Sequence, residues 1–197
     1  MIAVVDSGGA NLSSVLFALE RVGAQARLSA DPDFIARSPK VILPGVGAAG
    51  SAMQTLRTRE LIACLRELKQ PVLGICLGMQ ILYERSEEGD AGCLGVIPGT
   101  VRRLRLAANL TLPHMGWNQV RGCDPRGSLL LPKEEEESYF YFVHSFAAPA
   151  GESVRAVAEY GGAVPAIVEW KNWLGTQFHP ERSGRAGERL LARFAEL

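Results

Sequence analysis

"PVLGICLGMQ", residues 71–80, joins a short apolar run to a segment of helix-forming residues, and Cys76 stands at the junction. A strand buried within a parallel sheet has this apolar composition, because helices cover both of its faces. Gly74 and Gly78 lie two residues before and two residues after the cysteine. Residues that lack a side chain leave room for a sharp turn. The stretch therefore predicts a buried strand, a tight corner at Cys76 and a helix that opens with residues 79–83.

The rest of the chain extends this pattern into an α/β fold. The expected strands are residues 1–5, a segment within 24–33, the start of 40–50 and residues 71–75; the expected helices begin near Asn11 or Ser13 and cover residues 51–69. This alternation predicts a doubly wound, mostly parallel sheet with helices on both faces. After about residue 92 the stretches are strand-like until a helix over 186–197. We expect additional, partly antiparallel strands in this C-terminal half, and a single domain over residues 1–197.

Composition and charge exclude several classes of function. Lys and Arg together number 21, as do Asp and Glu, so the formal net charge is zero. A general nucleic-acid binder needs excess positive charge to neutralise phosphates, so we expect no nucleic-acid partner. The sequence shows neither a signal-peptide pattern nor an apolar run of about 18 residues, so we expect no membrane association and a cytoplasmic location. The four cysteines form no Cys-x-x-Cys pair, which argues against a zinc or redox motif.

The corner at Cys76 has the features of a nucleophile site. A Gly-x-Cys-x-Gly turn between a strand and a helix is similar to the nucleophile elbow of hydrolases, with cysteine in the place of serine. At a helix N-terminus the unpaired N–H groups favour a thiolate. The N–H group of Leu77 would point to the place where an oxyanion could form. The alternative is a buried structural cysteine in a tight turn.

A nucleophilic cysteine needs a base, and the chain contains three histidines. His179 is the best candidate, because it follows an expected strand over 173–178 and Glu181 lies two residues further on. In an extended chain these two side chains project to the same side, so Glu181 could orient the ring. His144 also ends an apolar strand and could border the same cleft or have a structural role. His114 has no carboxylate near it in the sequence and is expected to be non-catalytic.

The glycine-rich loop "LPGVGAAG", residues 43–50, follows another expected strand. Its backbone can approach a ligand closely, so it could supply a second oxyanion donor. A tight strand-to-helix turn and a phosphate cradle are the alternatives. A Walker loop is excluded, because no Gly-Lys-Ser/Thr follows.

Together, "PGVG", "GICLGMQ" and "FHPE" resemble the signature of the class I (triad) glutamine amidotransferases, in the order found in that family. Further stretches, "DSGGANLSSV", "LGVIPGTVRRL", "LPHMGWN", "YFYFVHSF" and "FHPERSG", are similar to the glutaminase subunits of imidazole glycerol phosphate synthases. The likeness extends over nearly the whole chain, and "PHMGWN" is its most discriminating part. It implies glutamine hydrolysis for histidine biosynthesis, without a cofactor or a metal ion.

The resemblance also implies roles for individual residues. Cys76 would attack the side-chain amide of glutamine to form a thioester, with His179 as the base and Glu181 as its orienter. The backbone N–H groups of Val46 and Leu77 would form the oxyanion hole. The positions that resemble the family's glutamine contacts are Gly47, Gln80, His144 and Ser145.

A partner is implied as well. In the family, ammonia passes to a (β/α)₈-barrel cyclase subunit, which forms imidazole glycerol phosphate and an aminoimidazole carboxamide ribotide. The residues expected on the face toward this subunit are Asn11, Met115, Gly116, Trp117 and Asn118. The 115–118 segment is expected to form a loop, and Trp117 could equally be an ordinary core aromatic residue.

The chain departs from the family pattern at five positions. The first loop usually reads Asp-Tyr-Gly-x-Gly-Asn, whereas this chain has Ser7 and Ala10 at the tyrosine and the second glycine. Ala49 and Ser51 stand where Phe and Asp are usual, and Phe146 stands where Tyr is common. None of these lies in the triad, but Phe146 lacks a hydroxyl group that could contact glutamine or the partner.

Three other functions are compatible with parts of the pattern. The chain could be the glutaminase subunit of another synthase, such as those of anthranilate, guanylate or pyridoxal phosphate synthesis; "PHMGWN" argues against this. It could be a cysteine-elbow hydrolase or deglycase of the stress-protein type, although such proteins lack the Phe-His-Pro-Glu segment. A non-catalytic binding module on the same fold would not need Cys76, His179 and Glu181 together.

Overall fold

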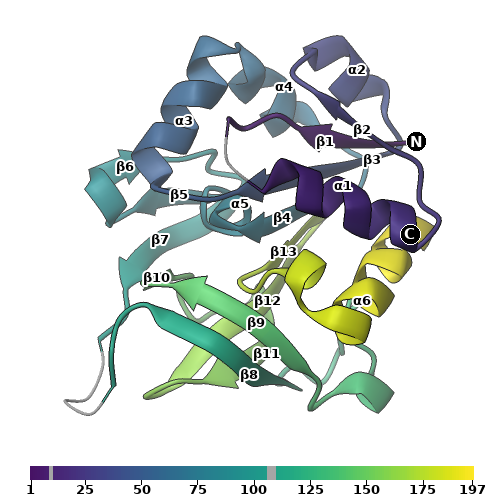
Figure 1. Ribbon diagram of the computed structural model, residues 1–197. Coiled ribbons are helices and arrows are strands. Elements are labelled where there is room, and N and C mark those ends of the chain that lie inside the picture. Colours follow the sequence, from purple (N-terminus) through teal and green to yellow (C-terminus); the bar gives the residue numbers. More distant parts are fainter. Residues whose placement is uncertain (9–10, 106–109) are drawn as a thin grey trace.

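The computed structural model describes residues 1–8, 11–105 and 110–197. A nine-stranded sheet runs through the molecule in the order β2-β1-β3-β4-β13-β12-β11-β8-β9 (Figure 1). Its strands are β1 (Ile2–Val5), β2 (Ala26–Ser29), β3 (Lys40–Gly45), β4 (Val72–Cys76), β8 (His114–Gly122), β9 (Tyr139–His144), β11 (Val154–Glu159), β12 (Ala163–Trp170) and β13 (Trp173–Thr176). A smaller sheet contains β5 (Tyr83–Ser86), β6 (Ala91–Gly92), β7 (Ile97–Arg103) and β10 (Phe146–Ala147).

The helices cover both faces of the parallel half of the large sheet. They are α1 (Leu12–Arg21), α2 (Pro32–Arg37), α3 (Ala49–Thr58), α4 (Leu61–Glu67), α5 (Leu77–Gln80) and α6 (Gly184–Glu196), with short 3₁₀ helices η1 (Glu88–Asp90), η2 (Lys133–Glu135) and η3 (Pro180–Arg182). Alternate residues of β3 point to opposite faces, so Ile42 packs with α1 and α6 whereas Leu43 packs with α2, α3 and α4. Figure 1 shows α1 and α6 as neighbours on the right of the view.

The sheet changes character at β13. Strands β2, β1, β3, β4 and β13 are parallel, and Trp173–Thr176 pairs residue by residue with Val72–Ile75 of β4. The strands beyond β13 pair antiparallel. The predicted α/β class, with helices on both faces and antiparallel strands in the C-terminal half, is therefore confirmed. No helix in the described ranges is long and apolar enough to cross a membrane.

The prediction of one helix over residues 51–69 is wrong, because the chain forms α3 and α4 with a break at Glu60. Glu60 has a φ of 59°, in the left-handed region. The apolar residues explain the break, since Leu56 and Leu61 are five positions apart rather than three or four. In one continuous helix they would point in different directions. The break lets both leucines enter the same core cluster.

Other boundaries also differ from the prediction. The helix after Cys76 ends at Gln80, and Tyr83 begins a strand instead of continuing it. The expected strand before His179 ends at Thr176. The segment "HMGWN", predicted to be a loop, is the start of β8, where His114 pairs with His144 of β9. Gly116, with a φ of 124°, interrupts its apolar alternation and hides the strand in the sequence.

Candidate active site

Cys76 lies at a strained corner between β4 and α5. Its φ of 52° and ψ of −109° are rare for a residue with a side chain, and such strain is concentrated at functional sites. The two flanking positions must be glycine, because a side chain at either one would clash with neighbouring atoms. A Cβ atom on Gly74 would lie 2.7 Å from the Gly78 carbonyl oxygen, and one on Gly78 would lie 1.8 Å from the Leu43 carbonyl oxygen. Neighbouring backbone atoms would have to move to admit either one.

Cys76 lies at the N-terminus of a helix, as the sequence predicted, because α5 begins at Leu77. Helix α5 has four residues, so its dipole contributes little at Cys76. The Cys76 Sγ atom instead lies 3.8 Å from the Gln177 Nε2 donor and 3.9 Å from the Val143 carbonyl oxygen. The His179 ring lines the same pocket, and its interaction with the thiol is one of the causes that raise the His179 pKa. The thiol is therefore surrounded by a backbone carbonyl of β9 and by side chains of the segment that follows β13, both far from it in the sequence.

His179 contacts Cys76 on one side and Glu181 on the other. Its Nδ1 atom donates to the Glu181 Oε1 atom over 2.7 Å, which leaves Nε2 for the sulfur. Glu181, which we expect in an extended segment from the sequence, lies in the 3₁₀ helix η3. The Asn11 Nδ2 atom donates to the same Glu181 oxygen over 2.5 Å. Asn11, expected at a partner surface, thus touches the carboxylate that holds His179.

The three histidines divide into one charged ring and two neutral rings. Burial lowers the pKa of His179, but hydrogen bonds to Cys76 and Glu181 and their negative charges outweigh it and raise the pKa to about 10. Burial lowers the pKa of His144 to about 4, and a hydrogen bond to the Phe146 carbonyl opposes this only in part. Burial also lowers the pKa of His114 to about 4. At neutral pH only His179 is thus an imidazolium.

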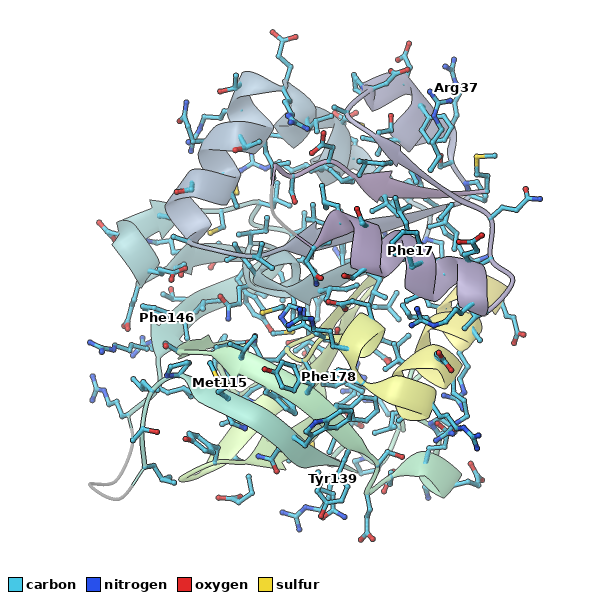
Figure 2. The ribbon with its side chains drawn as sticks, in the orientation of Figure 1. Phe17, Arg37, Met115, Tyr139, Phe146 and Phe178 are labelled. Atoms are coloured by element: carbon cyan, nitrogen blue, oxygen red, sulfur yellow. The ribbon has the colours of Figure 1, made fainter. Side chains whose placement is uncertain are left out.

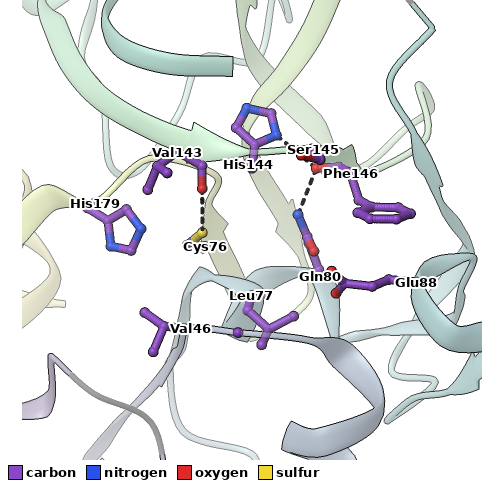
Figure 3. Close-up of a pocket in the computed structure, with 11 residues that line it drawn as sticks. Val46, Cys76, Leu77, Gln80, Glu88, Val143, His144, Ser145, Phe146 and His179 are labelled. Carbon is purple, nitrogen blue, oxygen red and sulfur yellow. Dashed lines mark hydrogen bonds between the residues drawn. The ribbon is translucent and has the colours of Figure 1, made fainter. Parts of the chain in front are cut away.

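A pocket of about 240 Å³ opens above the sulfur (Figure 3). Its lining residues are Val46, Gly47, Cys76, Leu77, Gln80, Glu88, Val143, His144, Ser145, Phe146 and His179. The structure therefore brings together the residues that the sequence proposed as nucleophile, base, oxyanion donors and glutamine contacts. Glu181 supports this group from behind His179.

Two residues of the site, Glu88 and Gln177, have no motif of their own in the sequence and were not predicted. Glu88 comes from η1, and its Oε2 atom accepts from the Ala49 N–H group over 2.9 Å, so it bridges the pocket wall to α3. Gln177 is fully buried and links the Cys76 sulfur to Gln80. Its position two residues before His179 was the one available signal, since residues near a base can share its site.

The proposed partner-facing residues of β8 lie on two faces of the strand. Met115 and Trp117 are 61% and 57% exposed, and Figure 2 shows Met115 and Tyr139 on the same outer side of the β8–β9 pair. Trp117 is therefore not a core residue. Gly116 lies between them, and the Asn118 amide turns inward to the His114 ring.

The departures from the family pattern have different surroundings. The Ser7 hydroxyl donates to the Pro44 carbonyl oxygen over 2.7 Å and so ties the first loop to the strand that precedes Val46. Ala10 lies outside the described residues. Ala49 is buried at the start of α3, whereas Ser51 is exposed. Phe146 lines the pocket, and its carbonyl oxygen accepts from Gln80 and His144.

Comparison with known proteins identifies the family. The model of the family "Glutamine amidotransferase class-I" matches residues 3–196. The chain belongs to the class I glutamine amidotransferases. Among relatives, the imidazole glycerol phosphate synthase subunit HisH of Xanthomonas axonopodis pv. citri is 49% identical over 196 residues, which cover 100% of this chain and 97% of that protein. HisH of Idiomarina loihiensis is also 49% identical, with the same coverage.

Solved structures of amidotransferases have the same fold. A structure described as a glutamine amidotransferase has a TM-score of 0.75 and 19% identity, covering 100% of this chain and 99% of that one. The structure of PurLQS from Thermotoga maritima has a TM-score of 0.72 and 19% sequence identity, and the match covers 99% of this chain and 97% of that one. These likenesses concern the fold. Within the described parts of this amidotransferase, no group of three His, Cys, Asp or Glu residues could hold a metal ion.

Proposed function

We propose that the chain is the glutaminase subunit of an imidazole glycerol phosphate synthase and that Cys76, His179 and Glu181 carry out the hydrolysis. The class I amidotransferase family and the full-length HisH relatives support the glutaminase activity and its place in histidine biosynthesis. The observation that carries the residue assignment is the strained Cys76 corner, where the thiol meets a His179 ring bonded to Glu181.

The reaction begins with attack of the Cys76 thiolate on the side-chain amide carbon of glutamine. The C=O electrons move to the oxygen, where the N–H groups of Val46 and Leu77 stabilise the negative charge. As the C–N bond breaks, His179 gives its proton to the leaving nitrogen, and ammonia departs from a γ-glutamyl thioester. The now neutral His179 takes a proton from water, which attacks the thioester and releases glutamate. Glu181 holds the ring and offsets its positive charge.

The pocket has the groups needed to hold the rest of glutamine. Glu88 is the carboxylate in its wall, and we assign it to the substrate's α-ammonium group. Gly47, Gln80, His144 and Ser145 border the same space and are assigned to the polar contacts. Both ring nitrogens of His144 bond within the protein, so its neutral ring shapes the pocket wall and adds no charge beside the thiolate.

Ammonia must then reach an acceptor on a partner subunit. At neutral pH free ammonia is mostly protonated and not nucleophilic, so a closed path to the partner is needed. Relatives described as synthase subunits support a partner of this kind, and we assign the cyclase, a (β/α)₈ barrel, to this role. The outer face of the β8–β9 pair, with exposed Met115, Trp117 and Tyr139, offers the Met and aromatic side chains enriched at interfaces.

The experiment is a glutaminase assay with and without the cyclase subunit and its nucleotide substrate. An electrophilic glutamine analogue should label Cys76, and peptide mass spectrometry should find no label on the exposed Cys123. Labelling of another cysteine, or glutamate release by a Cys76→Ala variant at the normal rate, would overturn the residue assignment.

The partner surface is tested with a matched pair of variants. Trp117→Ala should weaken cyclase binding about tenfold or more, as expected for a buried interface aromatic residue. Phe17→Ala is the control, because Phe17 is an aromatic residue with a similar exposed fraction, 60%, that lies on α1 and outside the β8–β9 pair. Equal loss of affinity in the two variants would remove the β8–β9 face from the proposal.

A further inference from the structure

Two buried histidines outside the triad form a hydrogen-bonded chain between β8 and the pocket. The Asn118 Nδ2 atom lies 3.1 Å from His114 Nε2, His114 Nδ1 lies 3.0 Å from His144 Nε2, and His144 Nδ1 lies 2.8 Å from the Phe146 carbonyl oxygen. All three side chains share the inner face of the β8–β9 pair. The His114 ring is stacked between Phe142 and Tyr160, with centroids 4.7 Å and 4.1 Å away.

The direction of every bond in this chain follows from its inner end. A carbonyl oxygen only accepts, so His144 must carry its proton on Nδ1 and accept at Nε2. His114 must then donate from Nδ1 and accept at Nε2. The group next to Nε2 of His114 must therefore be a donor.

The hydrogen bonds of Asn118, at the outer end of this series, independently require the same donor-to-acceptor direction. The Asn118 Oδ1 atom accepts from the Gln119 N–H group over 2.8 Å, and its Nδ2 atom donates to the Glu159 carbonyl oxygen over 2.9 Å. These two bonds fix the orientation of the amide, so the atom that faces His114 is the NH₂ donor. Both ends thus require the same Nδ1–H tautomer in both rings.

The chain continues from the pocket wall to the nucleophile. The Phe146 carbonyl oxygen also accepts from Gln80 Nε2 over 2.8 Å (Figure 3). Gln80 Nε2 donates to Gln177 Oε1 over 3.0 Å, and Gln177 Nε2 lies 3.8 Å from the Cys76 sulfur. The position of one carbonyl group therefore affects both His144 and the amides next to the thiol.

We propose that Asn118 and His114 are positioning residues for glutamine hydrolysis, which hold His144 and the Phe146 carbonyl group in place through this directional chain. Neither residue lines the pocket, so they act through His144. The proposal rests on the proposed glutaminase function. It also gives β8, whose outer face carries Met115 and Trp117, a physical connection to the glutamine site.

The sharpest test reverses one donor while keeping the shape of the side chain. Asn118→Asp replaces the NH₂ group that faces His114 with an acceptor. His114 must then carry a proton on Nε2, so it becomes either a buried cation or the opposite tautomer, which faces His144 with a bare nitrogen. Gln119→Glu makes the same chemical change at the next residue. The side-chain Nε2 atom of Gln119 donates to the Glu137 carbonyl oxygen and is not part of the hydrogen-bonded chain.

Two measurements are made on the full-length protein and on its complex with the cyclase subunit. Imidazole ¹H–¹⁵N spectra of the wild type should show two neutral rings protonated at Nδ1 and one imidazolium, and only Asn118→Asp should change a neutral ring. The KM for glutamine should rise about tenfold in Asn118→Asp, within the cost of a mispaired buried polar group, while kcat changes less than about threefold. Gln119→Glu should match the wild type.

Several outcomes would overturn the proposal. An Nε2–H tautomer in either neutral ring of the wild type would contradict the chain itself. A fall in kcat at unchanged KM would mean that Asn118→Asp only reduces the folded fraction. If Asn118→Asp does not fold, Asn118→Leu removes the donor without adding charge; an unchanged KM there would sink the idea, and a raised KM would support it. A wild type without glutaminase activity would instead refute the proposed function, and the spectra would still test the chain.

Discussion

His179 and His144 are buried to nearly the same extent, at 3% and 6% exposure, yet their pKa values move in opposite directions. Burial disfavours the charged form of both rings. His179 overcomes this penalty because it lies between a carboxylate and a thiol. His144 lies between a carbonyl oxygen and the neutral His114, and no anion compensates for its burial. The partners of a buried histidine, rather than its depth, thus decide whether it can carry protons or only position other groups.

The largest expected effect comes from removing the nucleophile next to His179. Cys76→Ala should lower glutamate release by at least about 10³-fold, because loss of a nucleophile removes the covalent route. Cyclisation with added ammonia should remain, since that chemistry belongs to the partner. Cys123→Ala, at an exposed cysteine, is the control. Loss of the ammonia-dependent reaction as well would point to damage to the complex.

The same substitution at the two histidines tests their different roles directly. His179→Asn should lower kcat by about 10²–10⁴-fold, the usual contribution of a positioned proton carrier. His144→Asn should mainly raise the KM for glutamine, by about tenfold, since it removes a pocket contact. Steady-state kinetics of both variants in the cyclase complex separate the two effects. If His144→Asn lowered kcat as much as His179→Asn, the base would have to be reassigned.

Glu181→Gln tests how much of the difference in pKa between His179 and His144 comes from the charge of Glu181. A glutamine oxygen can still accept from His179 and Asn11, so the ring should keep its orientation and lose only its negative neighbour. We expect about a 10- to 100-fold loss of kcat, smaller than that of His179→Asn, and a lower pKa of His179. The ¹⁵N titration of the ring measures this pKa. A variant as inactive as His179→Asn would mean that charge matters more than orientation.

The smallest effect concerns stability, where the two kinds of histidine give opposite pH dependence. His144 and His114 have lowered pKa values near 4, so between pH 6.5 and 4 the unfolded chain binds protons that the folded chain does not. Stability should therefore fall as the pH drops through this range, by at most about 1.4 kcal/mol per pH unit for each of the two rings. His179 has a raised pKa, so its contribution is complete below pH 6.5 and is lost as the pH rises toward 10.

Urea unfolding at several pH values checks both slopes. His144→Asn should flatten the acid slope and leave the alkaline one. His179→Asn should do the reverse. An acid slope that both variants leave unchanged would mean that other groups dominate it.

Much of the fold and of the site could be predicted from local sequence. The apolar run before Cys76 and the alternation of strands and helices predicted the parallel half of the sheet. The glycines on either side of the cysteine predicted the corner, because steric exclusion acts over a few residues. The break at Glu60 and the strand at 114–118 were missed, since the first depends on how two apolar stripes share one core and the second on pairing with β9.

The chemical groups of the site can be read from the amino-acid sequence: a cysteine in a glycine-flanked corner, a His-x-Glu segment, and two further histidines. Which of the histidines is charged depends on how the strands pair in the folded protein. The pairing of β13 with β4 carries His179 toward the thiol, whereas the pairing of β8 with β9 sets His144 against His114. Electrostatic and hydrogen-bond energies fall off within a few ångströms, so these roles depend on distances between residues far apart in the sequence.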